Sequence, residues 1–203
     1  MKLVLASASP ARAMLLKNAG LKFDVIVSNV DESEIQRRSE DLPPVELVTK
    51  LAVAKAQAVA AQVSDALVIG ADSMFLFDGQ LHGKPLDRET AQSRLQRMQG
   101  KFGELITGHA VIDTTTGICH QGTAAAVVQF SEMSELDIAA YLDSGEPLAV
   151  AGNFTLDGLG AAFIDHVTGD PAAVVGLSLS LLRRLITEHG HEYTQLWQLG
   201  SNN

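Results

Sequence analysis

Short apolar runs alternate with amphipathic stretches along this chain, which is the pattern of a mixed α/β protein. Strands are expected where an apolar run is too short to form a helix, over residues 3–5, 23–27, 66–77, 105–112 and 123–130. Helices are expected where apolar side chains recur with the 3.6-residue period, over residues 10–19, 45–62, 87–99, 134–144 and 179–189. The order of elements predicts a sheet covered by helices.

The turn after the longest apolar run decides how the sheet is built. Asp78 and Gly79 stand between two apolar stretches, and this dipeptide is typical of a tight β-hairpin. The strand over residues 66–77 is therefore expected to turn back through Leu81. Because hairpin strands are antiparallel, the sheet cannot be purely parallel.

The first apolar strand runs directly into a helix through small hydroxyl residues. Ser9 followed by Pro10 is an N-cap followed by a residue suited to the first helical turn. Free N–H groups and the positive end of the helix dipole would then lie beside Ser7, Ser9 and Arg12, an arrangement that suits a phosphate. The other interpretation is an ordinary capped helix.

Charged residues at apolar positions are the next candidates. Asp72 interrupts the apolar strand LVIGADSMFLF, so it is either paired structurally or part of a site. The hairpin carries Lys84 in HGKP, which predicts a cation near Asp72. Lys55 shares a helical face with apolar residues, and either its ammonium extends past them to solvent or it serves a site.

Two loops and the histidines complete the candidates. Asp31 and Glu32 are either metal ligands or acids of a solvated loop. Residues 151–160, AGNFTLDGLG, form either a loop whose backbone approaches a ligand or a plain surface connection. The histidines form no metal-binding pattern, and none is assigned a role. The sequence also has no P-loop, no GxGxxG and no GxSxG, so serine hydrolase chemistry is not expected.

Composition limits the class of protein. A chain of 203 residues is long enough for one domain with a real core. A single cysteine excludes an internal disulfide framework and, with no apolar run long enough to cross a membrane, predicts a cytoplasmic protein. A net charge of -9 argues against capture of a DNA or RNA polymer, so an anionic small substrate would need local cations or a metal.

In their order, these segments resemble the Maf family of nucleotide pyrophosphatases. The resemblance runs nearly from end to end and rests on LASASPAR from Leu5, VDES from Val30, LAVAKA from Leu51, GADS from Gly70, HGKP from His82, ITG from Ile106, YLDSGEP from Tyr141, AGNFTLDGLGAAF from Ala151 and VVGLSL from Val174. It implies one domain over residues 1–203, with a twisted mixed sheet flanked by helices, of the Maf and inosine-triphosphatase type, and a cleft between two lobes.

The resemblance also implies an activity. Maf proteins hydrolyse nucleoside triphosphates to the monophosphate and diphosphate with a divalent cation such as Mg²⁺, Mn²⁺ or Co²⁺, and in many members the assembly is a homodimer. The implied biological roles are removal of nucleotides that would be misincorporated and a link to arrest of cell division. The alternative is a nucleotide-binding regulator of septum formation with little catalysis.

Site residues follow from the same resemblance, position by position. It implies that Asp72 is the catalytic acid and, with Glu32, a metal ligand. The residues that it implies for substrate and phosphate binding are Ser9, Arg12, Lys55, Lys84 and Asp157. Whether Asp72 is a metal ligand or the general base stays open at this stage.

The chain departs from the family pattern at five positions. These are Ala11 in place of a second arginine, Ser73 in place of threonine, Gly103 in place of histidine, Ser178 in place of the proline of GLP, and Asp157 in place of glutamine or glutamate. A carboxylate only accepts hydrogen bonds. Asp157 therefore favours guanine or cytosine, including a methylated guanine, over uracil or thymine.

Overall fold

The computed structural model describes residues 1–85 and 87–198. Seven strands form one sheet in the order β2-β1-β3-β5-β6-β7, with β4 paired to β3. The strands are β1 (Lys2–Leu5), β2 (Asp24–Val25), β3 (Ala66–Phe77), β4 (Gln80–His82), β5 (Phe102–Asp113), β6 (Cys119–Phe130) and β7 (Ile164–Gly169). β1 pairs with β2 and β3 in parallel, whereas β3–β4 and β6–β7 are antiparallel, so the sheet is mixed as the hairpin predicts.

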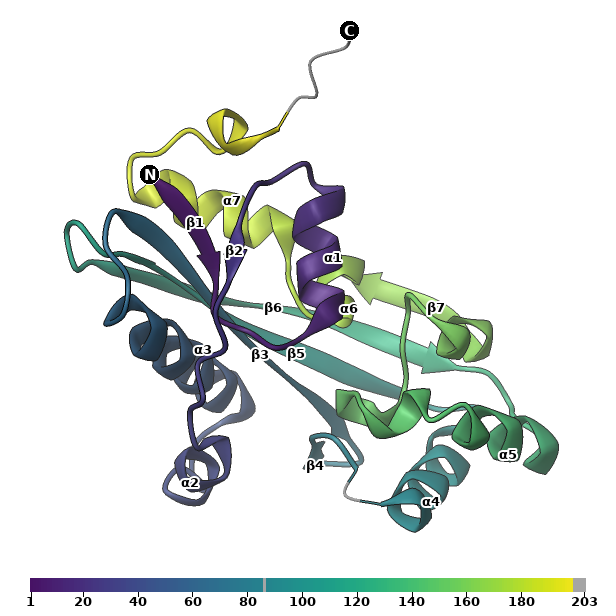
Figure 1. Cartoon of the computed structure of the whole chain (residues 1–203). Helices are drawn as coiled ribbons and strands as arrows, with labels where there is room; N and C mark the ends of the chain where they lie inside the picture. Colours follow the sequence, from purple (N-terminus) through teal and green to yellow (C-terminus); the bar gives the residue numbers. More distant parts are fainter. Residues whose placement is uncertain (86, 199–203) are drawn as a thin grey trace, which may run out of the picture. The chain divides into compact units, whose positions relative to one another are not determined.

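Among the described residues, helices α1 to α5 lie between strands in sequence, and α6 and α7 follow β7 (Figure 1). They are α1 (Pro10–Asn18), α2 (Glu32–Arg37), α3 (Pro44–Ala60), α4 (Arg88–Met98), α5 (Glu135–Asp143), α6 (Pro171–Val175) and α7 (Leu179–Glu188). Short 3₁₀ helices cover Glu146–Leu148, Ala151–Asn153, Leu159–Phe163 and Tyr193–Leu196. None of the helices found in the described ranges is long and apolar enough to cross a membrane.

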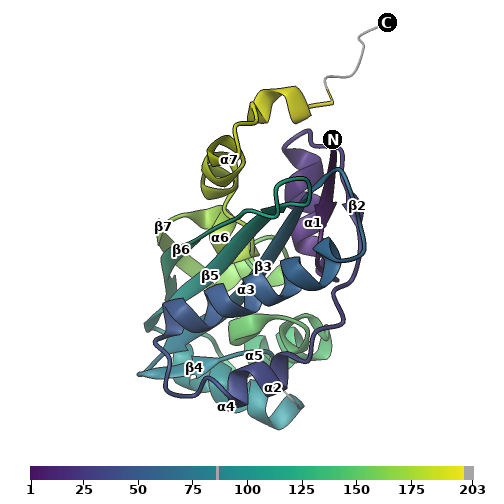
Figure 2. The same cartoon turned by 90° about the vertical axis from the view of Figure 1, so that its left-hand side faces the viewer.

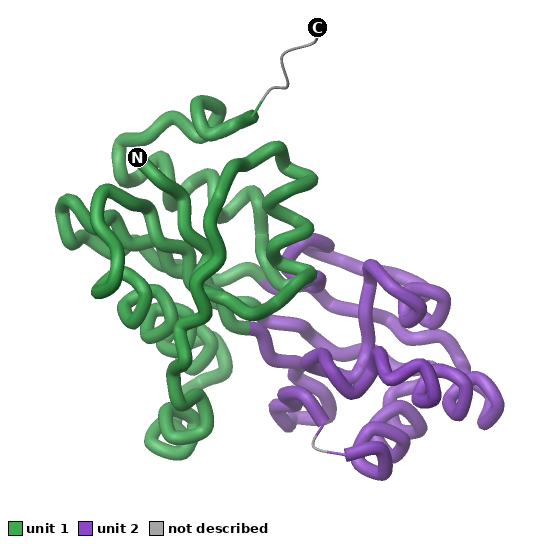
Figure 3. The backbone as a smooth tube through the Cα atoms, viewed as in Figure 1, with its two compact units in different colours: residues 1–72, 107–124, 176–203 green, residues 73–106, 125–175 purple. Residues whose placement is uncertain are grey.

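The chain forms two compact units, coloured separately in Figure 3. Unit 1 comprises Met1–Asp72, Thr107–Ala124 and Gly176–Asn203, and unit 2 comprises Ser73–Ile106 and Ala125–Val175. The long strands β3, β5 and β6 each contribute residues to both units. The predicted single domain with a cleft between two lobes stays a prediction.

The core of unit 1 lies on both faces of its part of the sheet. On one face, Leu3 and Leu5 of β1 pack with Leu16 of α1 and the apolar side of α7. On the other face, Val4 of β1 packs with α3 residues such as Ala52. Figure 2 shows α3 lying along the strands. The strand period of two sends neighbouring residues of β1 to opposite faces, so both faces are buried.

Gly70 allows β3 to lie directly against α3. A Cβ atom added at this position would collide with the carbonyl oxygen of Ala52 and would lie 2.9 Å from the amide nitrogen of Ala56. Both obstacles are backbone atoms of a packed helix, which cannot turn aside as a side chain can. This close approach places Asp72, two residues along β3, next to α3.

Replacing Gly70 by alanine is expected to lower the free energy of unfolding by about 3 kcal/mol, the upper end of the usual cost of overpacking. The measurement is urea denaturation followed by circular dichroism. Gly83→Ala is the matched control, because an added Cβ there meets no atom within 4 Å. Equal stability of the two variants would contradict the close packing of β3 on α3.

Unit 2 has its own core. Aromatic rings from three segments meet there, with Phe75 edge-on to Phe130 at 5.8 Å and to Phe154 at 5.3 Å between ring centres. A second apolar cluster joins α4 to α5, with Leu95 and Ile138 at its centre. Ser134 and Asp137 form the reciprocal capping box that the sequence predicts at the start of α5.

Most predicted elements are confirmed, and the exceptions have a physical reason. The strand expected over residues 23–27 contains only Asp24–Val25. Neither α2 nor β7 is predicted, because ESEIQR and IDHVTG contain too few apolar residues to show a period. The edge strand β7 is held in the sheet by its ladder with β6 rather than by a buried face.

Candidate active site

The β1–α1 turn is built as the sequence predicts. Helix α1 begins at Pro10, and the hydroxyl of Ser9 accepts a hydrogen bond from the Arg12 amide at 3.4 Å. The hydroxyl of Ser7 accepts from the Ser9 amide at 3.1 Å, which stabilises the turn before the cap. The positive end of α1 therefore begins directly beside the end of β1.

Arg12 points back from α1 rather than out to solvent. Its Nε donates to the Gly176 carbonyl at 2.8 Å, and one terminal nitrogen donates to the Ser7 hydroxyl at 3.2 Å. The side chain is buried, and burial lowers the pKa of its guanidinium, an effect that the nearby carboxylates of Asp72 and Glu32 oppose. Arg12 is therefore a fixed, buried cation at a helix N-terminus.

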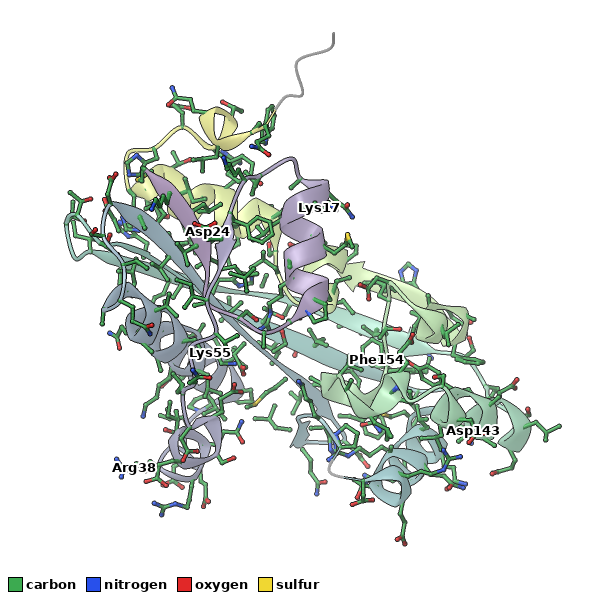
Figure 4. All side chains as sticks on the ribbon, viewed as in Figure 1. Lys17, Asp24, Arg38, Lys55, Asp143 and Phe154 are labelled. Carbon is green, nitrogen blue, oxygen red and sulfur yellow. The ribbon has the colours of Figure 1, made fainter. Side chains whose placement is uncertain are left out.

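Lys55 forms an ion pair with two carboxylates in unit 1. Its Nζ lies 2.6 Å from Oδ1 of Asp72 and 2.9 Å from Oε1 of Glu32. Figure 4 labels Lys55 on α3. Its side chain is only 8% exposed, so the interpretation that the ammonium extends to solvent is wrong. Asp72 and Lys55 are partners because β3 packs directly on α3.

The carboxyl of Asp72 is buried, and burial raises its pKa above the ordinary value of 3.8. The positive charges of Lys55 and Arg12 act in the opposite direction but do not cancel the effect of burial. A carboxylate with a raised pKa accepts a proton more readily than an exposed one. The role of Asp72, as metal ligand or as general base, stays a prediction.

Glu32 does not lie in a loop. It is the first residue of α2, and Asp31 is the N-cap, whose carboxylate accepts from the Glu34 amide at 2.9 Å. The alternative of a loop is therefore wrong for Glu32, whereas Asp31 precedes the helix and is exposed. The two acids have different roles, since Asp31 caps the helix and Glu32 reaches Lys55.

The carboxylates of Asp72 and Glu32 could supply only part of the ligand shell of a divalent cation. Within residues 1–85 and 87–198, no group of three or more histidine, cysteine, aspartate or glutamate side chains could hold a metal. Mg²⁺ commonly takes one or two carboxylates and completes its shell with water and substrate phosphates. Because Asp72 and Glu32 each place an oxygen on the same ammonium, they fit such an open site.

Two predicted site residues belong to unit 2. Lys84 follows β4 and is exposed, and Asp157 is exposed in the segment between two 3₁₀ helices. Ser9, Arg12, Glu32, Lys55 and Asp72 all belong to unit 1. The structure brings the acids and cations of unit 1 into one group, whereas the roles of Lys84 and Asp157 stay predictions.

Comparison with known proteins identifies the family. The family model described as Maf-like protein matches residues 2–189. The chain belongs to the Maf family. Curated relatives named nucleoside triphosphate pyrophosphatase resemble the chain over nearly its whole length. One from Streptomyces coelicolor is 52% identical and covers 97% of this chain and 94% of its own length. One from Salinispora tropica is 47% identical and covers 100% of this chain and 90% of its own length. One from a Synechococcus strain is 49% identical and covers 96% of this chain and 98% of its own length.

One departure from the Maf pattern has a clear structural reason. Gly103 stands where the resemblance predicts a histidine, and a Cβ added there would overlap the ring of Phe75. Phe75 is fully buried among the rings of unit 2 and cannot move aside cheaply. Glycine at position 103 therefore leaves room for the ring of Phe75, which a histidine side chain would displace. Nothing in the structure explains Ala11.

Glu146 is a residue that the sequence reasoning missed. Its carboxylate accepts hydrogen bonds from the hydroxyls of Tyr141 and Thr155 and from the amides of Leu159 and Gly160. The bonds to Thr155, Leu159 and Gly160 hold the two ends of the segment that carries Asp157 close together. YLDSGEP and AGNFTLDGLG were both recognised as family motifs, but spacing alone cannot show that an acid in the first binds the backbone of the second.

Glu146→Gln is expected to lower the free energy of unfolding at neutral pH by about 2 kcal/mol, because hydrogen bonds to a charged group are lost. Burial acts to raise the pKa of Glu146, but the hydrogen bonds from Thr155, Leu159 and Gly160 outweigh it, and the folded-state pKa is lowered. The ionised carboxylate therefore stabilises the protein above the unfolded pKa, near 4.5, and this contribution is lost as the pH falls through the folded pKa.

The measurement is the difference in Tm between the wild type and Glu146→Gln as a function of pH. The difference is expected to be large at pH 7 and to shrink below pH 4.5. Glu132→Gln, at an exposed position of unit 2, is the control and should leave Tm nearly unchanged. A difference that grows on acidification would contradict the assigned hydrogen bonds.

Arg94 of α4 was also missed. One of its terminal nitrogens donates to the Gly83 carbonyl at 3.0 Å and to Oδ1 of Asn153 at 3.2 Å. The side chain therefore joins the HGKP segment, which carries Lys84, to the 3₁₀ turn at Ala151–Asn153. Asn153 lies 59 residues from Arg94 in sequence, so only the fold shows that the two are in contact.

Proposed function

We propose that this chain hydrolyses nucleoside triphosphates to the nucleoside monophosphate and diphosphate. The observation that carries the proposal is a group of charges in unit 1, in which the buried cations Arg12 and Lys55 lie near the carboxylates of Asp72 and Glu32. Cations at a helix N-terminus suit a phosphate, and a buried acid suits activation of water. The names of full-length relatives in the Maf family support the same reaction.

In the proposed reaction, the oxygen of a water molecule attacks the α-phosphorus of the nucleotide. The bond from the α-phosphorus to the oxygen that bridges to the β-phosphorus breaks, and diphosphate leaves with that oxygen. Asp72 accepts the proton that the water loses. Arg12 and Lys55 stabilise the negative charge that develops on the phosphate oxygens, and removal of one such donor typically costs about 10²- to 10³-fold in rate.

A divalent cation completes this proposal. Asp72 and Glu32 would hold Mg²⁺, Mn²⁺ or Co²⁺, because their oxygens converge on one point that a positive group already occupies. When bound, such an ion neutralises phosphate charge and lowers the pKa of water. When no ion is bound, the ammonium of Lys55 keeps the two carboxylates together.

Residues of unit 2 are proposed to bind the rest of the nucleotide. Lys84 would contact phosphate, and Asp157 would accept hydrogen bonds from the edge of the base. Because a carboxylate cannot donate, it suits N1–H and the amine of guanine, or N4 of cytosine, rather than uracil or thymine. The bonds of Glu146 to Thr155 and Gly160 would hold Asp157 in a defined segment.

Turnover of dTTP, UTP, CTP, GTP and 7-methyl-GTP with Mg²⁺, Mn²⁺ or Co²⁺ tests the proposal. We expect one diphosphate for each monophosphate, no turnover after chelation with EDTA, and a preference of about tenfold or more for guanine or cytosine nucleotides. Release of single phosphates would contradict the reaction. A clear preference for dTTP or UTP would contradict only the role of Asp157.

The same measurements address the regulatory alternative. Tight binding of a triphosphate with no diphosphate released in the presence of any of the three metals would support a nucleotide-binding regulator of septum formation. The proposal places the enzyme in the cytoplasm, which its single cysteine favours. The homodimer and the link to cell division stay predictions.

A further inference from the structure

His109 is a fully buried histidine of unit 1 that the proposed reaction does not use. It lies on β5 and is 0% exposed. Its Nε2 accepts a hydrogen bond from the Ser178 amide at 2.8 Å, and its Nδ1 lies 3.0 Å from the Thr107 carbonyl. A backbone N–H can only donate, so Nε2 carries no proton and Nδ1–H donates to Thr107. The ring is therefore a neutral acceptor directed at Ser178.

Ser178 belongs to the turn that leads into α7. Its hydroxyl accepts from the Leu181 amide at 3.1 Å and caps the helix, while its own amide is bonded to His109. Two residues earlier in the same turn, the Gly176 carbonyl accepts from Nε of Arg12 at 2.8 Å. One short turn thus contacts His109 at one end and Arg12 at the other.

We propose that His109 is a positioning residue for the triphosphate, acting on Arg12 through the turn from Gly176 to Ser178. This inference rests on the proposed function, in which Arg12 binds phosphate. The bonds that hold Arg12 include those to the Gly176 carbonyl and to the Ser7 hydroxyl. Loss of the His109 bond frees the Ser178 amide and lets the Gly176 carbonyl move, so one of these anchors is weakened.

The residue at position 178 has to match the residue at position 109. Ser178 stands where the Maf pattern has proline, and proline has no N–H to donate. A proline at position 178 would therefore remove the hydrogen bond that Nε2 of His109 accepts from the residue 178 amide. Because a buried hydrogen bond is lost when either partner is changed, His109 and Ser178 act as one matched pair.

The test measures binding of a GTP analogue with a methylene group between the α- and β-phosphorus, in the presence of Mg²⁺, by calorimetry. His109→Leu removes the acceptor and is expected to weaken binding about tenfold, the worth of one buried hydrogen bond. His109→Gln, which restores an acceptor oxygen, should recover most of the loss. Ser178→Ala keeps the amide and should bind nearly as the wild type does, whereas Ser178→Pro should match His109→Leu.

The same substitutions in an Arg12→Ala background separate positioning from general damage. If His109 acts through Arg12, His109→Leu should weaken binding less than about twofold once Arg12 is absent. An equal loss in both backgrounds, or no loss in the wild-type background, would overturn the inference. Should His109→Leu fail to fold, Ser178→Pro provides the same comparison.

Failure of the inference and failure of the proposed function give different results. If the wild type does not bind the analogue, the proposed function fails. If Arg12→Ala binds as tightly as the wild type, the phosphate role of Arg12 fails, and the inference with it. If Arg12→Ala weakens binding while His109→Leu does not, only the positioning role of His109 is wrong.

Discussion

Replacing Asp72 by asparagine is expected to reduce turnover about 10²- to 10⁴-fold, the usual contribution of a general base. The amide keeps the size of the side chain and a hydrogen-bond acceptor for Lys55, but it cannot take a proton from water. The triphosphate should still bind, because Arg12 and Lys55 remain. The measurements are diphosphate release at saturating substrate and binding of the methylene analogue by calorimetry.

Asp113→Asn is the matched control for this result. Asp113 is also an acid of unit 1 and is 5% exposed, but its carboxylate bonds the Thr115 amide at 2.8 Å and takes no part in the proposed chemistry. Its substitution should leave turnover near that of the wild type. Turnover near the wild-type level in Asp72→Asn would refute the catalytic role of Asp72, whatever the control shows.

Replacing Lys55 by methionine is expected to lower the free energy of unfolding by about 3–5 kcal/mol, the typical cost of removing one partner of a buried ion pair. Methionine fills much of the same space, so the loss is one of charge rather than of packing. Asp72 is then left buried without its nearest cation. Glu32, the other partner of Lys55, has a side chain that is 47% exposed, so water can solvate its carboxylate. Urea denaturation monitored by circular dichroism measures the change.

Two further variants sharpen this second prediction. Lys50→Met, on the exposed side of the same helix, removes a hydrogen bond to Ser39 and should cost less than about 1 kcal/mol. The double variant Lys55→Met/Asp72→Asn should be more stable than Lys55→Met alone, because it removes the uncompensated charge. Equal stability of the single and double variants would contradict a buried ion pair between the two residues.

The strong local signals of the chain were enough to predict many of its helices and turns. Ser9 and Pro10 mark the start of α1 because capping depends on neighbouring residues alone. The 3.6-residue period of apolar side chains predicts the buried face of α3. The dipeptide Asp78-Gly79 predicts the hairpin between β3 and β4. Polar elements such as α2 and β7 escape this reasoning, because tertiary contacts rather than an apolar period hold them.

The candidate site shows the same division. The sequence predicts that Lys55 and Asp72 are unusual, since each places a charge among apolar residues. It predicts a cation near Asp72 but points to Lys84, which is near in sequence, whereas the observed partner is Lys55 on α3. The packing of a helix on a strand at Gly70 decides that partner, and no local pattern contains it.

By itself, the sequence determined the α/β class, the capped turn from Ser9 into α1, and the motifs that place the chain in the Maf family. Only the tertiary structure decided which charges meet: Lys55 with Asp72 and Glu32, and Arg12 with the Gly176 carbonyl. The reason is physical. Caps, turns and apolar periods depend on residues a few positions apart, whereas the pairing of buried charges depends on how distant elements pack.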